Sequence, residues 1–360
     1  MGRNKLYNEI TNYLKSAIQN GNLKVGEAIY SEPELCKKFN VSRTPVRNAI
    51  RQLAAENILV SRQGQGTYVK GDGHGLIHNA ICMVNHWTRK LRYDQTDTYY
   101  MDTIFGIEEE CNQRQINFQM FSGVISSKDE LLKQMKDRKL DGIILDGSYQ
   151  THEDDIKIFK SLTPHIVVLD GNPAETDLPC IAPDETGAFE KILELAAMHK
   201  NICFLHETMS AMGRRKLTAF KKAAKKYPSM KVIYADYSEN TGYETFFNIN
   251  HYPLTYKALE NVFAGNTHAD CIICDSDYTG VKSIKFLEIK NLRVPADVSV
   301  FGFGNIKFSL MSKPTLTTIR IDTAGMGRKS IEFLCDIIEG NANDKARFYP
   351  GSLIKRDSHK

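Results

Sequence analysis

From about residue 80 to the end of the chain, short uninterrupted apolar runs alternate with amphipathic stretches, and this pattern constrains the fold more than any other feature. The apolar runs are 80–84, 141–145, 166–169, 202–205, 232–234, 271–274 and 298–301, and 117–121 also has the pattern of a strand. Continuous apolar runs are typical of strands that are buried on both faces. Because such strands alternate here with helical patterns, the sequence predicts an α/β fold with a parallel sheet and right-handed crossovers.

The length of this region predicts two lobes, because about 280 residues exceed what a single hydrophobic core usually holds. No run of about 18 apolar residues occurs, so we expect no membrane span. The start from Met1 to Glu9 lacks the apolar segment of a secretory signal. Eight cysteines are scattered without regular spacing, which suits a reducing compartment. We therefore expect a cytoplasmic protein.

The first 70 residues differ from the remainder in charge. They carry 11 Lys and Arg against 5 Asp and Glu, whereas the remainder carries 36 against 38. The glycine-rich segment Gly71–Gly75 cannot support the interior of a helix or a strand. The sequence therefore predicts a small basic domain over residues 1–70, a linker over 71–76 and a second domain over 77–360. The basic charge of the first domain favours a polyanion as its partner.

A helix-turn-helix is predicted inside the basic domain. Ser31 can cap a helix, and Glu34 three residues later completes a capping box. Asn40 tolerates the left-handed conformation that ends such a helix. Ser42 caps a second helix, and Pro45 falls in its first turn, where a missing N–H does little harm.

The second helix is suited to the DNA major groove. Its first turns present Arg43, Thr44 and Arg47. Arginine can donate two parallel hydrogen bonds to guanine, and the helix N-terminus adds partial positive charge. Two β-prone runs, 58–62 and 67–69, then flank a glycine-rich tetrapeptide and predict a hairpin. A hairpin directly after a recognition helix is a wing, whose tip would lie near the minor groove or the DNA backbone.

Residues 5–69 resemble the winged-helix domain of GntR-type bacterial regulators. The matching residues include Ser31-Glu32, Val41–Arg47 and Gly64–Val69. The resemblance implies that this domain contacts double-stranded operator DNA. The implied contacts, together with the capping serine, are Ser42, Arg43, Thr44, Arg47, Gln65 and Gly66. Pro45 departs from the family, which more often has a hydroxyl residue there, and this would remove one phosphate contact.

The second domain resembles the effector domain of LacI-type repressors, which is related to periplasmic sugar-binding proteins. Val298–Gly304, Lys313–Arg320 and Leu353–Ser358 carry the resemblance by their order and spacing. It implies a two-lobed, doubly wound effector-binding and dimerisation domain, in which the chain crosses between the lobes near residues 181, 305 and 340. A GntR-type reader joined to a LacI-type domain resembles the arabinose-operon repressor type.

Ligands of doubly wound sheets collect outside the carboxyl ends of the strands. Polar residues in such positions are Asp170, Asp275, Ser276, Asp277 and Asn305. Their carboxylates, hydroxyl and amide suit the hydroxyls of a small carbohydrate. Trp87 follows the first strand and could pack on the sugar ring. Three of these residues have a structural alternative: Asp170 as a turn residue, Asp277 as a helix cap and Trp87 as a contact to the linker or to a partner.

A basic residue before Ala219-Phe220 grips the sugar in the related family. Strict spacing places Lys216 there, and a shift of one residue places Arg215, so both stay candidates beside Arg214. Two departures argue against transferring a known sugar. The family usually has an acid at Gly304 and an asparagine at Ser276.

These features predict a homodimeric, ligand-responsive transcription regulator. Repression of carbohydrate-utilisation genes, relieved when a sugar binds, is the favoured function. A regulator whose ligand strengthens DNA binding or recruits polymerase is the alternative, and a sugar-acting enzyme is a further one. No nucleophile, base and orienting group come together in the sequence. We accordingly expect no catalytic residue, no metal and no cofactor.

Overall fold

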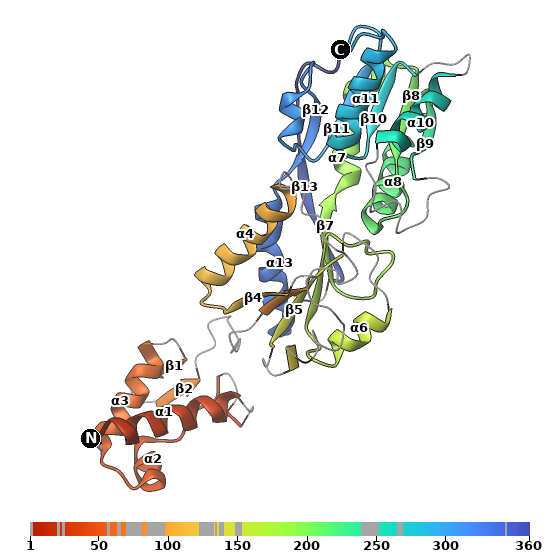
Figure 1. Ribbon diagram of the computed structural model, residues 1–360. Coiled ribbons are helices and arrows are strands. Elements are labelled where there is room, and N and C mark those ends of the chain that lie inside the picture. Colours follow the sequence, from red (N-terminus) through yellow and green to blue (C-terminus); the bar gives the residue numbers. More distant parts are fainter. Residues whose placement is uncertain are drawn as a thin grey trace. The chain divides into compact units, whose positions relative to one another are not determined.

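The structure is a computed structural model that describes residues 3–19, 22–23, 26–55, 58–62, 66–69, 81–84, 98–121, 133, 135–136, 140–147, 153–238, 252–264, 269–342 and 344–360 (Figure 1). Contacts divide the chain into two units. The first contains residues 1–80 and 335–342, and the second contains residues 81–334 and 343–360. The predicted linker, residues 71–76, lies outside the described residues, so the predicted domain boundaries stay a prediction. No helix in the described ranges is long and apolar enough to cross a bilayer.

The first unit has the predicted order of three helices and a hairpin. The elements are α1 (Arg3–Gln19), α2 (Glu32–Phe39), α3 (Arg43–Ala55), β1 (Leu59–Arg62) and β2 (Gly66–Val69). The two strands are antiparallel, with Leu59 opposite Val69. A core that includes Ile10, Leu14 and Leu53 joins the helices and the hairpin. The predicted helix-turn-helix and the hairpin that follows it are both confirmed.

The predicted ends of α2 are also confirmed. The Ser31 N–H donates to Glu34 Oε2 over 2.7 Å, and Ser31 Oγ accepts from the Glu34 N–H over 3.4 Å. This pair is the predicted capping box. Asn40 adopts φ +50° and ψ +50°, the left-handed conformation expected at the helix end. Because these signals act over three or four residues, neighbouring sequence alone specifies them.

The second unit contains an eleven-stranded sheet in the described residues. The first five strands are β3 (Ile81–Val84), β4 (Phe118–Phe121), β5 (Gly142–Asp146), β6 (Ile166–Leu169) and β7 (Cys180–Asp184). The next five are β8 (Asn201–His206), β9 (Lys231–Asp236), β10 (Cys271–Cys274), β11 (Ser299–Phe303) and β12 (Thr317–Ile321). We call these sets, with the helices packed on them, the first lobe and the second lobe. The strand β13 (Ala346–Ile354) lies between β7 and β12.

All neighbouring strands are parallel except β12 and β13. The predicted parallel α/β architecture with two lobes is therefore confirmed. In the second lobe, α7 (Glu185–Leu195) and α8 (Ala211–Ala224) pack on one face of the sheet, and α10 (Tyr252–Phe263) and α11 (Asp277–Ile289) pack on the other. Cys271 belongs to the first of these packing layers and Cys274 to the second. Their side chains diverge, as the alternation along a strand predicts.

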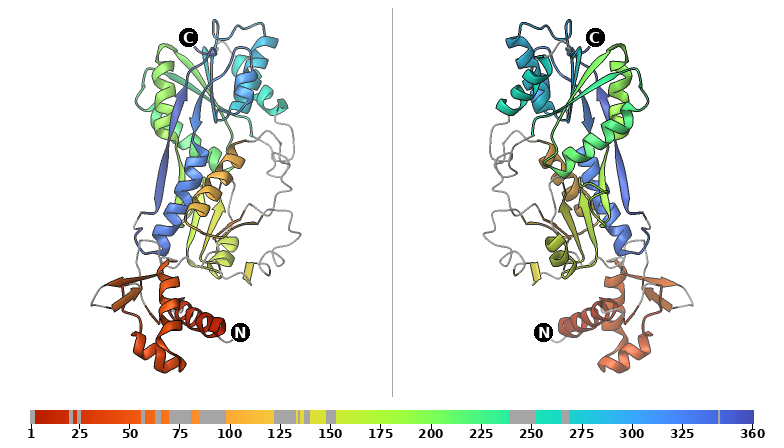
Figure 2. Two further views of the ribbon diagram at one scale, coloured as in Figure 1. Left: turned by 90° about the vertical axis from the view of Figure 1, so that its left-hand side faces the viewer. Right: turned by 90° about the vertical axis from the view of Figure 1, so that its right-hand side faces the viewer.

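Two helices of the first lobe approach each other closely (Figure 2). They are α4 (Thr98–Gln113) and α13 (Thr323–Ile338). A Cβ atom added at Gly106 would lie 1.9 Å from the backbone oxygen of Ala324, and one at Gly327 would lie 2.2 Å from that of Thr103. Glycine is therefore required at both positions for the helices to pack at this distance. The first lobe also contains α6 (Glu153–Lys160).

The chain passes between the lobes three times. The first passage leads from β7 to α7 and the second from β12 to α13. The third lies inside β13, where residues 346–350 pair with β7 and residues 351–354 pair with β12. Residue 181 lies in β7 beside the first passage, whereas residue 340 lies ten residues before the third. Residue 305 instead lies between β11 and β12, which pair directly within the second lobe, so the second passage is near residue 322.

Candidate functional sites

The first candidate site is the exposed start of α3. Its inward face buries Val46, Ala49, Ile50 and Leu53. The four predicted DNA-binding residues at its start are all exposed: Ser42, Arg43, Thr44 and Arg47. Gly66 is exposed as well and adopts φ +114°, a conformation that favours glycine. Gln65 lies outside the described residues. The packing of the apolar face therefore leaves two arginines and two hydroxyls on the free N-terminal surface of one helix.

Arg47 has a partner that sequence reasoning missed. Its Nε lies 2.9 Å from Glu32 Oε2 and 3.1 Å from Glu32 Oε1, so α2 holds the side chain from the neighbouring helix. The side chain of Arg47 remains 53% exposed. Because arginine carries five N–H donors in a planar fork, this pairing through Nε leaves its terminal nitrogens able to donate. Glu32 stands beside the capping serine in sequence, and only the angle between α2 and α3 brings it to Arg47.

The second candidate site lies at the carboxyl ends of the strands in the second lobe. Asp275 follows β10 and is buried. Its carboxylate accepts from the Glu207 N–H over 3.0 Å, from the Tyr237 hydroxyl over 3.1 Å and from the Thr279 hydroxyl over 3.1 Å. Lys216 Nζ donates to the backbone oxygen of Asp275 over 2.9 Å. The end of β10 is therefore a dense polar network around Asp275, whose position after the strand the sequence predicted but whose partners it did not.

Ser276 and Asp277 have different roles at the start of α11. Ser276 is the N-cap, because its Oγ accepts from the Thr279 N–H over 3.3 Å. Asp277 is fully buried and accepts from the Ile306 N–H over 2.8 Å and from the Thr318 hydroxyl. Burial raises the pKa of Asp277 to about 6. Asp277 therefore holds the segment after β11 in place, and the alternative that it caps α11 is wrong.

Asn305 stands in that segment with φ +54°. Its Oδ1 accepts from Arg356 Nη2 over 2.5 Å. Arg356 also donates to Ser309 Oγ over 2.9 Å and to the Leu316 backbone oxygen over 2.7 Å. The backbone N–H of Asn305 donates to Thr318 Oγ1 over 3.4 Å. The end of the chain thus orients a predicted effector residue.

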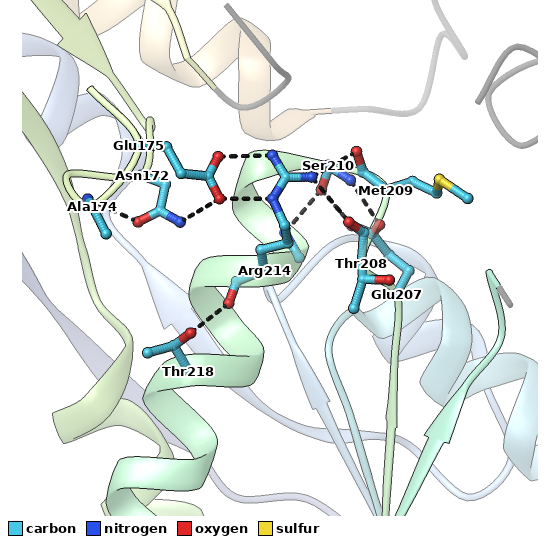
Figure 3. A network of polar contacts seen from close by, with 10 residues as sticks. Asn172, Ala174, Glu175, Glu207, Thr208, Met209, Ser210, Arg214 and Thr218 are labelled. Atoms are coloured by element: carbon cyan, nitrogen blue, oxygen red, sulfur yellow. Dashed lines mark hydrogen bonds and ion pairs between the residues drawn. The ribbon is translucent and has the colours of Figure 1, made fainter.

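The three consecutive basic residues of α8 separate into different environments. Arg215 is buried and contacts Asp170 and Glu185. Arg214 is partly exposed and pairs with Glu175 (Figure 3). Lys216 points to the end of β10, with its Nζ 4.8 Å from the centre of the Phe303 ring. Of the three, Lys216 is therefore the residue that shares the strand ends with Ser276 and Asn305, whereas both arginines contact the first lobe.

The carboxyl group of Glu207 has a raised pKa. Burial raises its pKa to about 7, and the neighbouring Asp275 raises the pKa in the same direction, while hydrogen bonds from Ser210 oppose both. Glu207 Oε2 accepts from the Ser210 N–H over 2.9 Å. The carboxyl group thereby lies at the N-terminus of α8.

This shift predicts a change in the pH dependence of stability. Between the ordinary pKa near 4.5 and the folded-state pKa of about 7, the folded protein retains a proton that the unfolded chain releases, so stability falls as pH rises through this window. Glu207→Gln should make stability less dependent on pH over this window. Urea unfolding at both ends of the window measures it, with the exposed Glu288→Gln as control. Equal pH dependence in Glu207→Gln and in the wild type would contradict the shift.

A separate pocket of about 510 Å³ lies at the opposite, amino ends of β10 and β11. Its lining combines apolar and charged side chains: Glu260, Phe263, Ala264, Ala269, Asp270, Lys290, Leu292, Asp297 and Val298. None of the predicted effector residues lines it. Trp87, the predicted ring platform, lies outside the described residues.

Comparisons with known proteins match both parts of the chain. Residues 6–69 match the family of bacterial regulatory proteins, gntR family, and residues 195–359 match the periplasmic binding protein-like domain. The arabinose metabolism transcriptional repressor of Geobacillus stearothermophilus is 25% identical over 381 residues, which cover 98% of this chain and 97% of that protein. The transcriptional repressor MelR of Bacillus subtilis is 24% identical over 344 residues, which cover 92% of each.

Solved structures share the fold of the second unit. The ribose operon repressor protein from Lactobacillus acidophilus superposes with a TM-score of 0.60 at 18% identity, covering 78% of this chain and 98% of that one. The lac repressor dimer bound to operator and an anti-inducer also has a TM-score of 0.60, at 17% identity, covering 78% of this chain and 94% of that one. At this level of identity the likeness concerns the fold.

Proposed function

We propose that this chain, in which a GntR-type winged-helix domain is joined to a LacI-type periplasmic-binding-protein-like domain, is a ligand-responsive bacterial transcription regulator. It acts in the cytoplasm, represses carbohydrate-utilisation genes, and releases operator DNA when a sugar binds. It has no catalytic role. The observation that carries the proposal is the similarity to an arabinose metabolism repressor over 98% of this chain and 97% of that protein. The alignment therefore spans both of the regions in which this chain matches a family.

The DNA contacts follow from the exposed start of α3. Arg43 and Arg47 reach base edges in the major groove, where arginine can donate two hydrogen bonds to guanine. Ser42 and Thr44 bind phosphates beside the helix N-terminus, which favours negative charge. Gly66 allows the wing backbone to approach the duplex. The exposure of all five residues supports this assignment.

The effector binds at the strand ends of the second lobe. Lys216, Ser276 and Asn305 supply an ammonium, a hydroxyl and an amide there, and Trp87 packs on the sugar ring. Asp277 acts through the segment that it holds, since its carboxylate already accepts from Ile306 and Thr318. Asp170 and Arg215 are committed to each other by an ion pair of 2.6 Å. We therefore assign them to the contact between the lobes rather than to the sugar.

The protein acts as a homodimer. A two-fold protein matches a palindromic operator, and one half-site gives few contacts. Apolar side chains are exposed on the first lobe, where Met101 and Phe105 of α4 are 41% and 58% exposed and Met120 of β4 is 44% exposed. Among the described strands, β4 stands at one end of the sheet, in the same lobe. These features support the first lobe as the dimer face.

A binding experiment tests both halves of the proposal. Purified full-length protein should bind a duplex selected from random sequences, with an affinity that falls steeply as salt rises. In a thermal-shift screen of pentoses, hexoses and their phosphates, a true effector at about 100 times its Kd should stabilise the protein by about 2.7 kcal/mol. The same sugar should then release the duplex in a mobility-shift assay.

The outcomes separate the alternatives. No salt-sensitive binding to any duplex would overturn the regulator. No stabilising compound in the screen would overturn the carbohydrate effector while leaving the DNA reader intact. A sugar that strengthens binding to the duplex would identify the alternative regulator, in which the ligand promotes DNA binding.

A further inference from the structure

Two consecutive arginines on α8 each contact both lobes. Arg214 and Arg215 lie on a helix of the second lobe, and each donates to acceptors of that lobe and to acceptors in the segment after β6 of the first lobe. Neither their place in the sequence nor the similarity to other proteins predicts that these arginines contact both lobes. Arg215 had been a candidate for gripping the effector.

Arg215 makes the buried half of this arrangement. Its Nε and Nη2 each lie 2.9 Å from a carboxylate oxygen of Glu185, which begins α7 directly after the first passage between the lobes. Its Nη2 also lies 2.6 Å from Asp170 Oδ1, and its Nη1 donates to the backbone oxygens of Asp170 and Gly171. The three charged side chains are at most 7% exposed. Asp170 adopts φ +59°, a conformation in which its backbone oxygen and its carboxylate both meet the guanidinium.

Arg214 makes the outer half (Figure 3). Its Nε and Nη2 each lie 2.7 Å from an oxygen of Glu175 in the first lobe, a two-point pairing of the kind that fixes geometry as well as charge. Its Nη1 donates to the backbone oxygens of Thr208 and Met209 in its own lobe, over 2.9 and 3.0 Å. The Arg214 and Glu175 side chains are 31% and 36% exposed, so water can reach this pair.

We propose that Arg214 and Arg215 form an interlobe latch with Glu175, Asp170 and Gly171, which holds the two lobes at one angle and biases the proposed effector site between its conformations. The contacts of Arg215 form the buried arm of the latch, and they include Glu185, which directly follows β7 at the first passage between the lobes. The contacts of Arg214 form the outer arm, whose ion pair with Glu175 can separate into water at a small cost in free energy. The existence of the latch is independent of what the protein binds, whereas its regulatory effect rests on the proposed function.

A distance measurement on the free protein tests the latch directly. Spin labels are introduced as unnatural amino acids at Lys160, exposed on α6 of the first lobe, and at Glu288, exposed on α11 of the second lobe. Double electron–electron resonance then measures the distance between the two labels, and so between the lobes, in the full-length chain. Dilution with unlabelled chains removes distances between subunits.

The outer arm gives the milder variants, which should fold. In Arg214→Gln and in Glu175→Gln, the population at distances other than the main one should rise about two- to fivefold, the factor expected for loss of a partly exposed ion pair. The double variant should rise no further than Arg214→Gln alone, because both changes break one contact. Lys226→Gln is the matched control, since Lys226 follows α8 and its ion pair with Glu190 of α7 lies within the second lobe.

Arg215→Lys tests the buried arm without removing its charge. Lysine cannot reproduce the planar fork that contacts two carboxylates and two backbone oxygens, so the interlobe distances should broaden more than in Arg214→Gln. Distance distributions that match the wild type in Arg214→Gln, Glu175→Gln and Arg215→Lys would overturn the latch. Additive effects in the double variant would show that Arg214 and Glu175 act separately, which also overturns it.

The regulatory consequence has its own readout. If the latch biases the angle between the lobes, Glu175→Gln should change the affinity for the selected duplex by the same two- to fivefold, although Glu175 lies outside the DNA-binding domain. Broadened distances with unchanged DNA affinity would refute the coupling while the latch itself stands. Loss of all DNA binding in the wild type would instead refute the proposed function.

Discussion

Replacement of Arg215 by leucine is expected to lower the free energy of unfolding by about 3–5 kcal/mol, the loss that follows when one partner of a buried ion pair is removed. Leucine keeps part of the hydrophobic stem but leaves Asp170 and Glu185 without their shared cation. Both carboxylates are buried, so water cannot replace the guanidinium. Urea unfolding followed by circular dichroism measures the loss.

The same variant should show a steeper pH dependence. Burial raises the pKa of Glu185, and Arg215 opposes this rise. Without Arg215 the folded-state pKa rises further, and a carboxyl group with a raised folded-state pKa loses stability as pH increases from its unfolded-state value to its folded-state value. The loss should therefore be larger in mildly alkaline than in mildly acidic buffer.

The control for this prediction is Lys226→Leu. Its partner is the partly exposed Glu190, and the Lys226 side chain is 61% exposed, so the change should cost no more than about 1 kcal/mol. If Arg215→Leu proved as mild as this control, the charges around Arg215 would have to be hydrated and the buried network would be refuted.

Arg47→Ala should weaken binding to the selected duplex by about 1–3 kcal/mol, or roughly 5- to 150-fold in Kd, because a bidentate contact to a base is lost. Arg47 is well placed for this contact, since Glu32 holds its Nε and its side chain is still half exposed. Fluorescence anisotropy at one fixed salt concentration measures the change.

Base contact and simple charge are distinguished by a second duplex and a second arginine. Loss of a base contact should affect the selected duplex more than a scrambled one. Arg51→Ala removes another exposed positive charge one turn later on α3, and it should weaken binding to both duplexes by a similar factor. Equal losses on both duplexes in Arg47→Ala would place Arg47 on the phosphates.

The winged helix could be predicted almost completely from sequence. The capping box of Ser31 and Glu34, the left-handed Asn40 and the glycine of the wing act through neighbouring residues. Such signals do not depend on distant parts of the chain. The pair of Arg47 with Glu32 is the exception, because 15 residues and a helix–helix angle separate the two side chains.

The sheet could be predicted where its strands are uniformly apolar. Three strands were not among the apolar runs: β7, β12 and β13. Each carries polar or turn-forming residues, such as Pro183, Thr318 and Pro350, and each lies at or beside the junction of the lobes. There the pattern of burial depends on both lobes at once, so local hydrophobic periodicity is a weak signal.

The candidate effector site could be predicted as a region but not as a set of contacts. Asp170, Ser276, Asp277 and Asn305 do follow the ends of strands, since topology places them there, whereas their binding of an effector stays a prediction. Their partners come from residues up to 51 positions away, as in the contact of Arg356 with Asn305.

Local sequence and tertiary structure thus determine different features of this protein. The order of apolar runs, caps and glycines was sufficient by itself to establish a winged helix followed by a two-lobed parallel sheet, because those features act through near neighbours. Only the tertiary structure decided that adjacent Arg214, Arg215 and Lys216 serve different partners. Three consecutive side chains on a helix point about 100° apart, so what each one meets depends on the surfaces that folding brings around α8.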